Sequence, residues 1–282
     1  MRDRKLTFRL ICGDDELNLD GKDYSVLDYE GLESTDYQIN SDINIIGHGV
    51  TIRRTSVLAR EIMLKFDFTG AGDILEARDY LIWFFRPETA GTLYVDYSGT
   101  VRCIDYTVST GIKFANKNVH EDLTATVYLT CADPEFRTTE DTVFDLTSRS
   151  GGWKWKFRLP FHMRQSVEQK RNVYNDGHLA CPVEIYFHGP AESPKVTNER
   201  TGEFVQLGRN LASSETLYIN TRHRHKEVSI ITADGTADAF GYITEASTFF
   251  QLEPGDNMIS YTAGSLTSTG AQIRYRPLFY GI

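Results

Sequence analysis

The sequence has no apolar run that approaches the roughly 18 residues of a membrane-spanning helix. Its first eight residues are rich in charge and lack the apolar segment of a secretory signal peptide. We therefore expect a chain that is made in the cytosol, stays there initially and does not insert into a membrane.

Motifs of catalysis and cofactor binding are missing as well. There is no Gly-x-Ser-x-Gly elbow, no Walker loop and no dinucleotide fingerprint, because Gly47-His-Gly49 lacks a further glycine and the start of a helix. The Glu-x-Asp-x-x-Glu strand pattern of some sandwich glycosidases is also absent. We expect no enzyme, no cofactor and no catalytic residue.

Cysteine is scarce, and the four cysteines have no Cys-x-x-Cys spacing. This argues against a zinc knuckle or a redox pair, and buried thiols are expected. His223 and His225 would point the same way from a strand, but no third ligand is visible. We interpret the pair as a basic strand edge that resists edge-to-edge pairing, and no metal site is predicted.

Positive charge is nearly missing from residues 13–42, which hold ten acidic residues and one base, Lys22. The net charge of -9 therefore arises in this segment, and the rest of the chain is balanced. An acidic segment on a neutral body disfavours nucleic-acid binding.

Strand patterns dominate the first half of the chain. Residues 7–12 alternate as an opening strand, and Asp20-Gly21 suits a type I′ hairpin turn. Residues 92–106 predict two strands around Ser98-Gly99. Asp73, with Glu76 three residues later, predicts a capped helix that ends before Pro87.

A hinge follows the strand at residues 124–131, because Asp133-Pro134 stops it and residues 137–152 are rich in Thr, Ser, Asp and Gly. The second half shows only short strands separated by turns, which is typical of a sandwich. We predict a mainly β protein: an antiparallel sheet with one helix at 1–136, a linker at 137–144 and a β-sandwich at 145–282.

Both halves contain segments whose order and spacing carry a family resemblance. In the first half these are Leu81-Ile-Trp-Phe-Phe-Arg-Pro87, Leu93-Tyr-Val-Asp-Tyr-Ser-Gly-Thr-Val-Arg102 and Cys131-Ala-Asp-Pro-Glu-Phe136. In the second half they are Asn175-Asp-Gly177, Pro182-Val-Glu-Ile-Tyr-Phe-His-Gly189, Pro194-Lys-Val-Thr-Asn198, Thr201-Gly-Glu203, Leu217-Tyr-Ile-Asn-Thr221 and Phe250-Gln-Leu-Glu-Pro-Gly-Asp-Asn257. Taken together, these segments resemble the siphophage distal tail proteins of Gram-positive hosts.

The resemblance implies a structural protein of the distal virion tail, assembled in the cytoplasm of the bacterial host. N-terminal domains would form a hexameric ring around a channel, with galectin-like sandwiches projecting outward, and the rings would stand singly or stacked. The implied partners are the tail tube protein, a tail tip or tail-associated protein and a receptor-binding protein. DNA would only pass through the channel.

Two sets of residues are predicted to serve the ring. Its contacts are expected along residues 62–68 and 94–106, with the candidates Ile62, Leu64, Phe66, Phe68, Tyr94 and Tyr97. The channel is expected to be lined by acids that repel DNA phosphates, with the candidates Asp14, Asp15, Glu16 and Asp20.

The alternative function is a cell-wall carbohydrate-binding protein that uses the C-terminal sandwich. Its sugar platform would be Trp153 and Trp155, whose alternation with Lys and Arg also suits core packing. The galectin-like half lacks the His-x-Asn-x-Arg and Trp-x-x-Glu patterns of sugar-binding galectins. The scaffold interpretation is therefore preferred.

Overall fold

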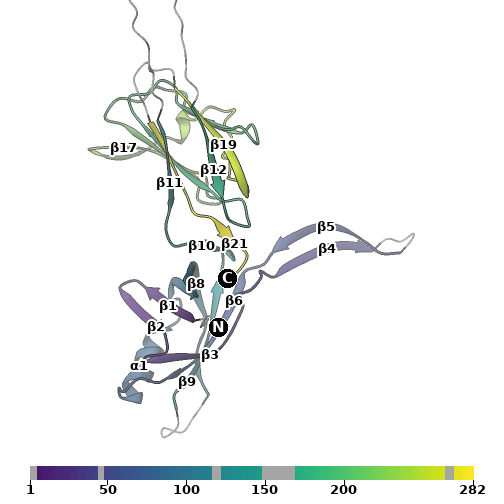
Figure 1. The fold of residues 1–282 in the computed structure, drawn as a ribbon, viewed down its shortest axis with the longest axis vertical. Helices are drawn as coiled ribbons and strands as arrows, with labels where there is room; N and C mark the ends of the chain where they lie inside the picture. The colour runs from purple at the N-terminus through teal and green to yellow at the C-terminus, as the bar shows by residue number, and fades with distance from the viewer. Residues whose placement is uncertain (1–4, 44–47, 116–121, 148–168, 264–269) are drawn as a thin grey trace, which may run out of the picture. The chain divides into compact units, whose positions relative to one another are not determined.

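A computed structural model describes residues 5–43, 48–115, 122–147, 169–263 and 270–282 (Figure 1). The chain divides into two compact units. Unit 1 comprises Met1–Thr139 and Phe279–Ile282, and unit 2 comprises Glu140–Leu278. The chain therefore leaves unit 1 once and returns to it with its last four residues.

Unit 1 is built on an antiparallel sheet with the strand order β2-β1-β7-β8-β9-β6-β3, and β10 and β21 extend it beside β8. Its outer strands are β2 and β3. The strands are β1 (Leu6–Cys12), β2 (Asp15–Leu19), β3 (Tyr24–Glu30), β6 (Arg60–Phe68), β7 (Ala90–Tyr97), β8 (Thr100–Phe114), β9 (Thr124–Cys131), β10 (Phe136–Thr138) and β21 (Leu278–Phe279).

One helix covers this sheet in the part of unit 1 that the structure describes. Helix α1 (Ile74–Phe84) starts at Asp73, whose carboxylate accepts a hydrogen bond from the Leu75 N–H at 3.0 Å. Its buried residues, Ala77, Leu81 and Phe84, pack into the core of the sheet. The predicted helix and its N-cap at Asp73 are confirmed.

Two turns were predicted in unit 1, and one prediction was wrong. Ser98 and Gly99 form the two-residue turn between β7 and β8, with positive φ angles, as expected. The other hairpin turn is made by residues 13 and 14, not by Asp20-Gly21, because β2 pairs with β1 and β3 pairs with β6. This pairing buries Leu17 and Leu19 in the core.

The remaining strands of unit 1, β4 (Tyr37–Ile43) and β5 (Val50–Val57), pair only with each other among the described residues. They form a two-stranded ribbon that leaves the main sheet of the unit after β3 (Figure 1). We call this ribbon the arm.

Unit 2 is a sandwich of two antiparallel sheets around one core. The six-stranded sheet has the order β11-β20-β13-β16-β17-β18, and the four-stranded sheet has the order β12-β19-β14-β15. The strands are β11 (Thr142–Thr147), β12 (Gln169–Asn175), β13 (Val183–His188), β14 (Lys195–Asn198), β15 (Phe204–Gln206), β16 (Thr216–Asn220), β17 (Glu227–Thr232), β18 (Gly235–Asp238), β19 (Gly255–Thr262) and β20 (Gly270–Tyr275), with a 3-10 turn at Phe240–Tyr242.

The predicted fold class is confirmed: the protein is mainly β, with an antiparallel sheet and helix followed by a β-sandwich. The division between the units falls after Thr139, and β11 begins at Thr142, inside the segment that the sequence suggested as a linker. The last four residues belong to unit 1. No helix in the described ranges is both long and apolar enough to cross a bilayer.

Candidate assembly surface

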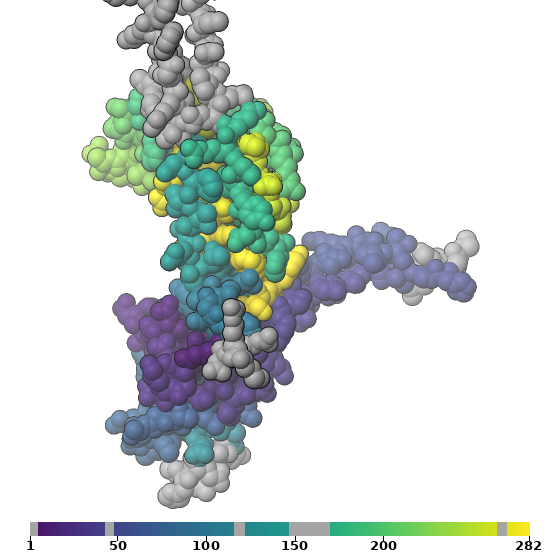
Figure 2. Space-filling view, in the orientation of Figure 1, coloured from purple at the N-terminus to yellow at the C-terminus, as the bar shows by residue number. Residues whose placement is uncertain are grey.

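The arm projects from unit 1, and its described side chains are exposed to solvent (Figure 2). Every described side chain of β4 and β5 is exposed except Ser56, which is half-buried. A two-stranded ribbon in water is only marginally stable, since it has no layer to cover either face. The arm therefore lacks a packing partner within the described part of its own unit.

The two faces of the arm differ in chemistry. Residues that pair across two antiparallel strands lie on the same face. Tyr37 pairs with Val57, Ile39 with Thr55 and Ser41 with Ile52, and Val50 continues that face. The opposite face holds Gln38, Asn40, Asp42, Thr51, Arg54 and Ser56. One face is thus mainly apolar and the other is entirely polar.

A β-bulge maintains this separation. The pairing shifts between Asn40 and Ser41, so that Arg53 is an extra residue in β5. If Arg53 instead paired regularly with Ser41, the pairing beyond it would move by one position, and Ile52 would fall on the polar face. Arg53 also makes an ion pair with Asp42, which is exposed and contributes little stability.

The apolar face is large enough to need an explanation. Tyr37, Val50 and Ile52 are 60%, 54% and 59% exposed, and Ile39 and Val57 are about half exposed. Contiguous exposed apolar surface on a folded unit marks a contact with another molecule more often than isolated apolar residues do. The arm is the candidate assembly surface of unit 1.

The predicted ring contacts lie elsewhere. Ile62, Leu64 and Phe66 are completely buried in the core of unit 1, and β6 has partners on both sides, β9 and β3. These three side chains leave no surface for another subunit. Phe68 and Tyr94 are half-buried, and Arg9 lies 4.6 Å from the centre of the Tyr94 ring. Tyr97, next to the β7–β8 turn, is 39% exposed.

The predicted channel acids lie together at one edge of the main sheet. Asp14 is in the β1–β2 turn, Asp15 and Glu16 begin the outer strand β2, and Asp20 follows its end. Asp20 accepts a hydrogen bond from the Lys22 N–H, which lowers the pKa of its carboxyl group. Their position relative to a channel stays a prediction.

The thiols are consistent with a structural role. Cys103, Cys131 and Cys181 are buried and Cys12 is half-buried, and none of these four is in a disulfide. Burial raises the pKa of both Cys131 and Cys181 to about 12, so these thiols stay protonated at neutral pH. The described residues contain no cluster of three or more His, Cys, Asp or Glu side chains that could hold a metal ion.

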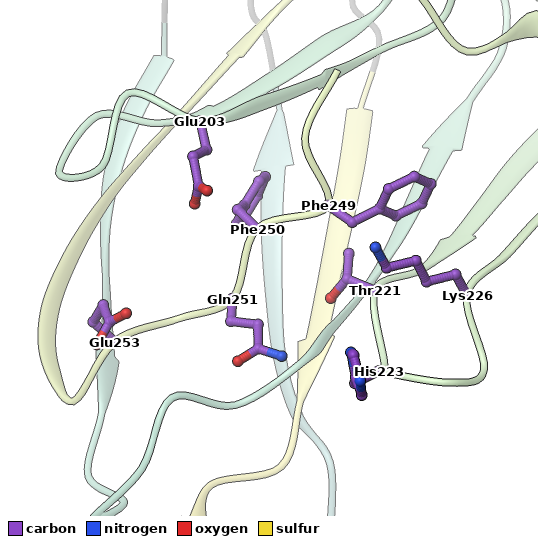
Figure 3. A pocket seen from close by; sticks show the side chains of 8 residues that line it. All are labelled: Glu203, Thr221, His223, Lys226, Phe249, Phe250, Gln251 and Glu253. Atoms are coloured by element: carbon purple, nitrogen blue, oxygen red, sulfur yellow. The ribbon is translucent and has the colours of Figure 1, made fainter. Parts of the chain in front are cut away.

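Unit 2 carries a shallow pocket of about 270 Å³ (Figure 3). Glu203 and Glu253 lie on one side of it, and His223 and Lys226 lie on the other. The hydroxyl of Thr221, in its lining, bonds to the backbone of Val183 and is not poised as a nucleophile. The pocket offers polar contacts of both signs, but it does not assemble a catalytic group.

The sequence predicted that the histidine pair lies on a strand, and the structure shows that it does not. His223 and His225 occupy the turn between β16 and β17, where the His225 N–H donates to the Arg222 carbonyl at 3.1 Å. Trp153 and Trp155, the predicted sugar platform, lie outside the described residues.

The arm was not predicted as a contact surface, although the sequence contains its signal. Tyr37 and Ile39 alternate with polar residues before a turn at His48-Gly49, and Val50 and Ile52 alternate after it. The fold and this surface define a class of protein: a two-unit β protein whose N-terminal unit presents an amphipathic ribbon that pairs with no other strand in the described ranges.

Comparisons with known proteins find similarity to phage tail components. Residues 176–279, almost all within unit 2, match the family described as "Siphovirus-type tail component, C-terminal domain". No curated protein sequence matches the chain. Together with the structural matches below, the family match confirms the predicted resemblance to siphophage distal tail proteins.

Solved structures share the fold of nearly the whole chain. The crystal structure of the SPP1 Dit protein, described as a paradigm of the hub adsorption apparatus in phages that infect Gram-positive bacteria, matches with a TM-score of 0.68 and 15% identity over 97% of this chain and 99% of that chain. Two structures of the phage P2 baseplate in its activated conformation, one with Ca and one with Sr, each contain a chain that matches with a TM-score of 0.55 and 11% identity. Both matches cover 96% of this chain, and they cover 98% of the chain in the Ca structure and 97% of the chain in the Sr structure.

Proposed function

We propose that this protein is the structural hub of a siphophage tail. Six copies would form a ring through unit 1, around the channel at the distal end of the virion tail. The ring would connect the tail tube protein to the tail tip and receptor-binding proteins, after assembly in the host cytoplasm. The family match in unit 2 and the hub-like fold support this role, which requires no reactive side chain.

The apolar face of the arm is the observation that carries the proposal. Identical copies that join head to tail form a closed ring when each copy offers a surface that fits a different surface on the next copy. The arm is a suitable donor surface, because its apolar side chains have no cover within the described part of unit 1. Full burial of an exposed apolar side chain contributes about 1.5–3 kcal/mol, so burial of one of these half-exposed side chains contributes about half of that to association.

Two adjacent residues of β4 provide a matched test. Ile39→Asn changes the apolar face, and Gln38→Asn introduces the same residue on the polar face. We expect Ile39→Asn to weaken ring formation about 10- to 100-fold, since the interface loses a buried apolar side chain and buries an amide group in its place. Gln38→Asn should leave ring formation unchanged. Native mass spectrometry and light scattering over a range of concentrations would measure both.

The same measurement separates the hub from its alternative. Rings of six, or stacked rings, that disappear in the Ile39→Asn variant support the hub. A chain that stays monomeric at high concentration and binds isolated cell-wall glycan would instead support the carbohydrate-binding function.

The acids around β2 belong to the same proposal. If Asp14, Asp15, Glu16 and Asp20 face the channel, the ring should repel DNA phosphates there. Replacement of all four by Asn or Gln should then increase the retention of assembled rings on immobilised DNA at low salt. Equal retention of parent and variant rings would remove the acids from the channel wall.

A further inference from the structure

A buried arginine stands at the base of the arm. Arg60 begins β6, three residues after β5 ends, and is 3% exposed. Its guanidinium donates to the carbonyls of Gly31 at 2.6 Å, of Pro134 at 2.7 Å and of Tyr280. These carbonyls come from three segments: the end of β3, the end of β9 and the last residues of the chain.

The last residues pack against the segment that leads into the arm. The Ile282 N–H donates to the Leu32 carbonyl at 3.0 Å. Gly281 lies so close to Glu33 that a Cβ on this glycine would be 1.4 Å from the Glu33 carbonyl oxygen. Arg102 also holds residues 279–282, because it donates to the Gly281 carbonyl and lies 3.6 Å from the centre of the Phe279 ring.

Both strands of the arm therefore start from the same anchored site. Residues 32–36 connect β3 to the arm, and Leu32 and Thr35 are buried there. The Leu58 N–H donates to the Asp36 carbonyl at 2.9 Å and closes the ribbon just beyond its last pair. Beyond the returning strand the chain reaches Arg60, which donates to Gly31 at the start of the segment that leads from β3 to the arm.

We propose that Arg60 and residues 279–282 form a clamp that sets the direction in which the arm leaves unit 1. This inference rests on the proposed function, in which the arm must meet the neighbouring copy at one angle for the ring to close. The clamp makes the angle depend on a segment from the opposite end of the chain.

Arginine suits this position for a geometric reason. Its guanidinium presents five N–H donors in a rigid planar fork and stays protonated, whereas the lysine ammonium is a compact group on a flexible stem. Burial lowers the pKa of Arg60, but an arginine remains charged at neutral pH. Each of its carbonyl partners is thus held by a fixed charge-assisted hydrogen bond.

Spin labels on a non-assembling chain can test the clamp directly. Labels at Asn40→Cys on the arm and Thr100→Cys at the β7–β8 turn would be compared in a Cys12→Ser, Ile39→Asn background. The other cysteines are buried and should resist labelling. Double electron–electron resonance then reports the distribution of distances between the arm and the main sheet, whether or not the parent forms rings.

Two clamp variants and two controls complete the design. Arg60→Lys removes the forked guanidinium, and Gly281→Ala forces residues 279–282 away from Glu33 without removing a hydrogen-bonding group. Arg9→Lys and Gly111→Ala are matched controls in unit 1, since a Cβ at Gly111 meets nothing within 4 Å. We expect the width of the distance distribution to at least double in both clamp variants and to stay constant in both controls. Folded clamp variants with the parent width would overturn the proposal.

Hydrogen exchange on the unmodified chain covers the case in which a clamp variant does not fold. The clamp predicts that the amides of Leu58 and Ile282 exchange with the same protection factor within about threefold, because one opening event exposes both. Protection at Leu58 with free exchange at Ile282 would refute it. If the parent forms rings but the distance distributions of the clamp variants are not broader, the hub is supported and the clamp is rejected. If the parent forms no rings but the distributions broaden, the clamp is supported and the hub is rejected.

Discussion

Unit 1 contains two ribbons with the same alternation of apolar and polar residues but opposite surroundings. The β7–β8 ribbon lies between β1 and β9, and its Leu93, Val95 and Ile104 are completely buried. The β4–β5 arm pairs with no other strand in the described ranges, and Ile39 and Ile52 are 48% and 59% exposed. Alternation shows that one face will be buried, but it does not show whether the cover comes from the same chain.

This difference has a practical meaning for the assembly. A face that is buried within the unit contributes to the stability of the monomer, whereas a face that is buried only against another copy contributes only to association. Mutations in the two ribbons should therefore separate the stability of unit 1 from ring formation.

The largest effect is expected in the core of the main sheet. Phe66→Ala should lower the free energy of unfolding of unit 1 by about 3–5 kcal/mol, because it leaves a cavity beside Tyr24 and Phe85. Tyr37→Ala on the arm should change it by less than about 0.5 kcal/mol. Denaturant titrations that resolve the two units would measure both, and equal costs would contradict the contrast between core and arm.

The next largest effect should be a loss of stability at alkaline pH. Burial raises the pKa of Cys131 to about 12 from its ordinary value of 9.0. The unfolded thiol therefore loses its proton above pH 9, while the native thiol keeps it, so stability falls as pH rises from 9 toward 12. This thiol should account for about 2 kcal/mol of the loss by pH 10.5. Unfolding at pH 8 and 10.5 should show a smaller loss in Cys131→Ala than in the parent or in Cys12→Ala.

A change in the alternation of the arm should affect assembly more than stability. Insertion of one alanine between Asn40 and Ser41, opposite Arg53, restores a regular pairing and moves Ile52 and Val50 to the polar face. We expect less than about 1 kcal/mol of change in the unfolding of unit 1, together with loss of rings at concentrations where the parent forms them. Deletion of Arg53 also restores a regular pairing but leaves Ile52 paired with Ser41 on its present face, and it serves as the control. Rings from the insertion variant would show that the two faces are not separated for assembly.

The smallest effect is expected for one methyl group on the arm. Ile52→Val removes about 0.8 kcal/mol of burial in the interface, equivalent to about fourfold weaker association. The melting temperature of the monomer should not change, since the Ile52 side chain is 59% exposed there. Sedimentation velocity across a dilution series would detect the shift, and an unchanged association constant would place Ile52 outside the ring contact.

The wrong predictions share a cause. Ile62, Leu64 and Phe66 were expected as ring contacts because an alternating strand resembles an edge, but β9 and β3 occupy both of its sides. Asp20-Gly21 has the composition of a tight turn, but the partners of β2 and β3 lie elsewhere in the sheet. Local residues specify a strand or a turn, whereas strand order depends on partners far away in the chain.

The sequence by itself determined the mainly β class, the helix capped by Asp73 and the turn at Ser98-Gly99. These features depend on propensities and patterns within a few residues. Only the tertiary structure decided that the apolar face of the arm has no cover in the described part of unit 1, and that residues 279–282 meet Arg60. Such contacts join residues as many as 220 positions apart, and no local pattern specifies them.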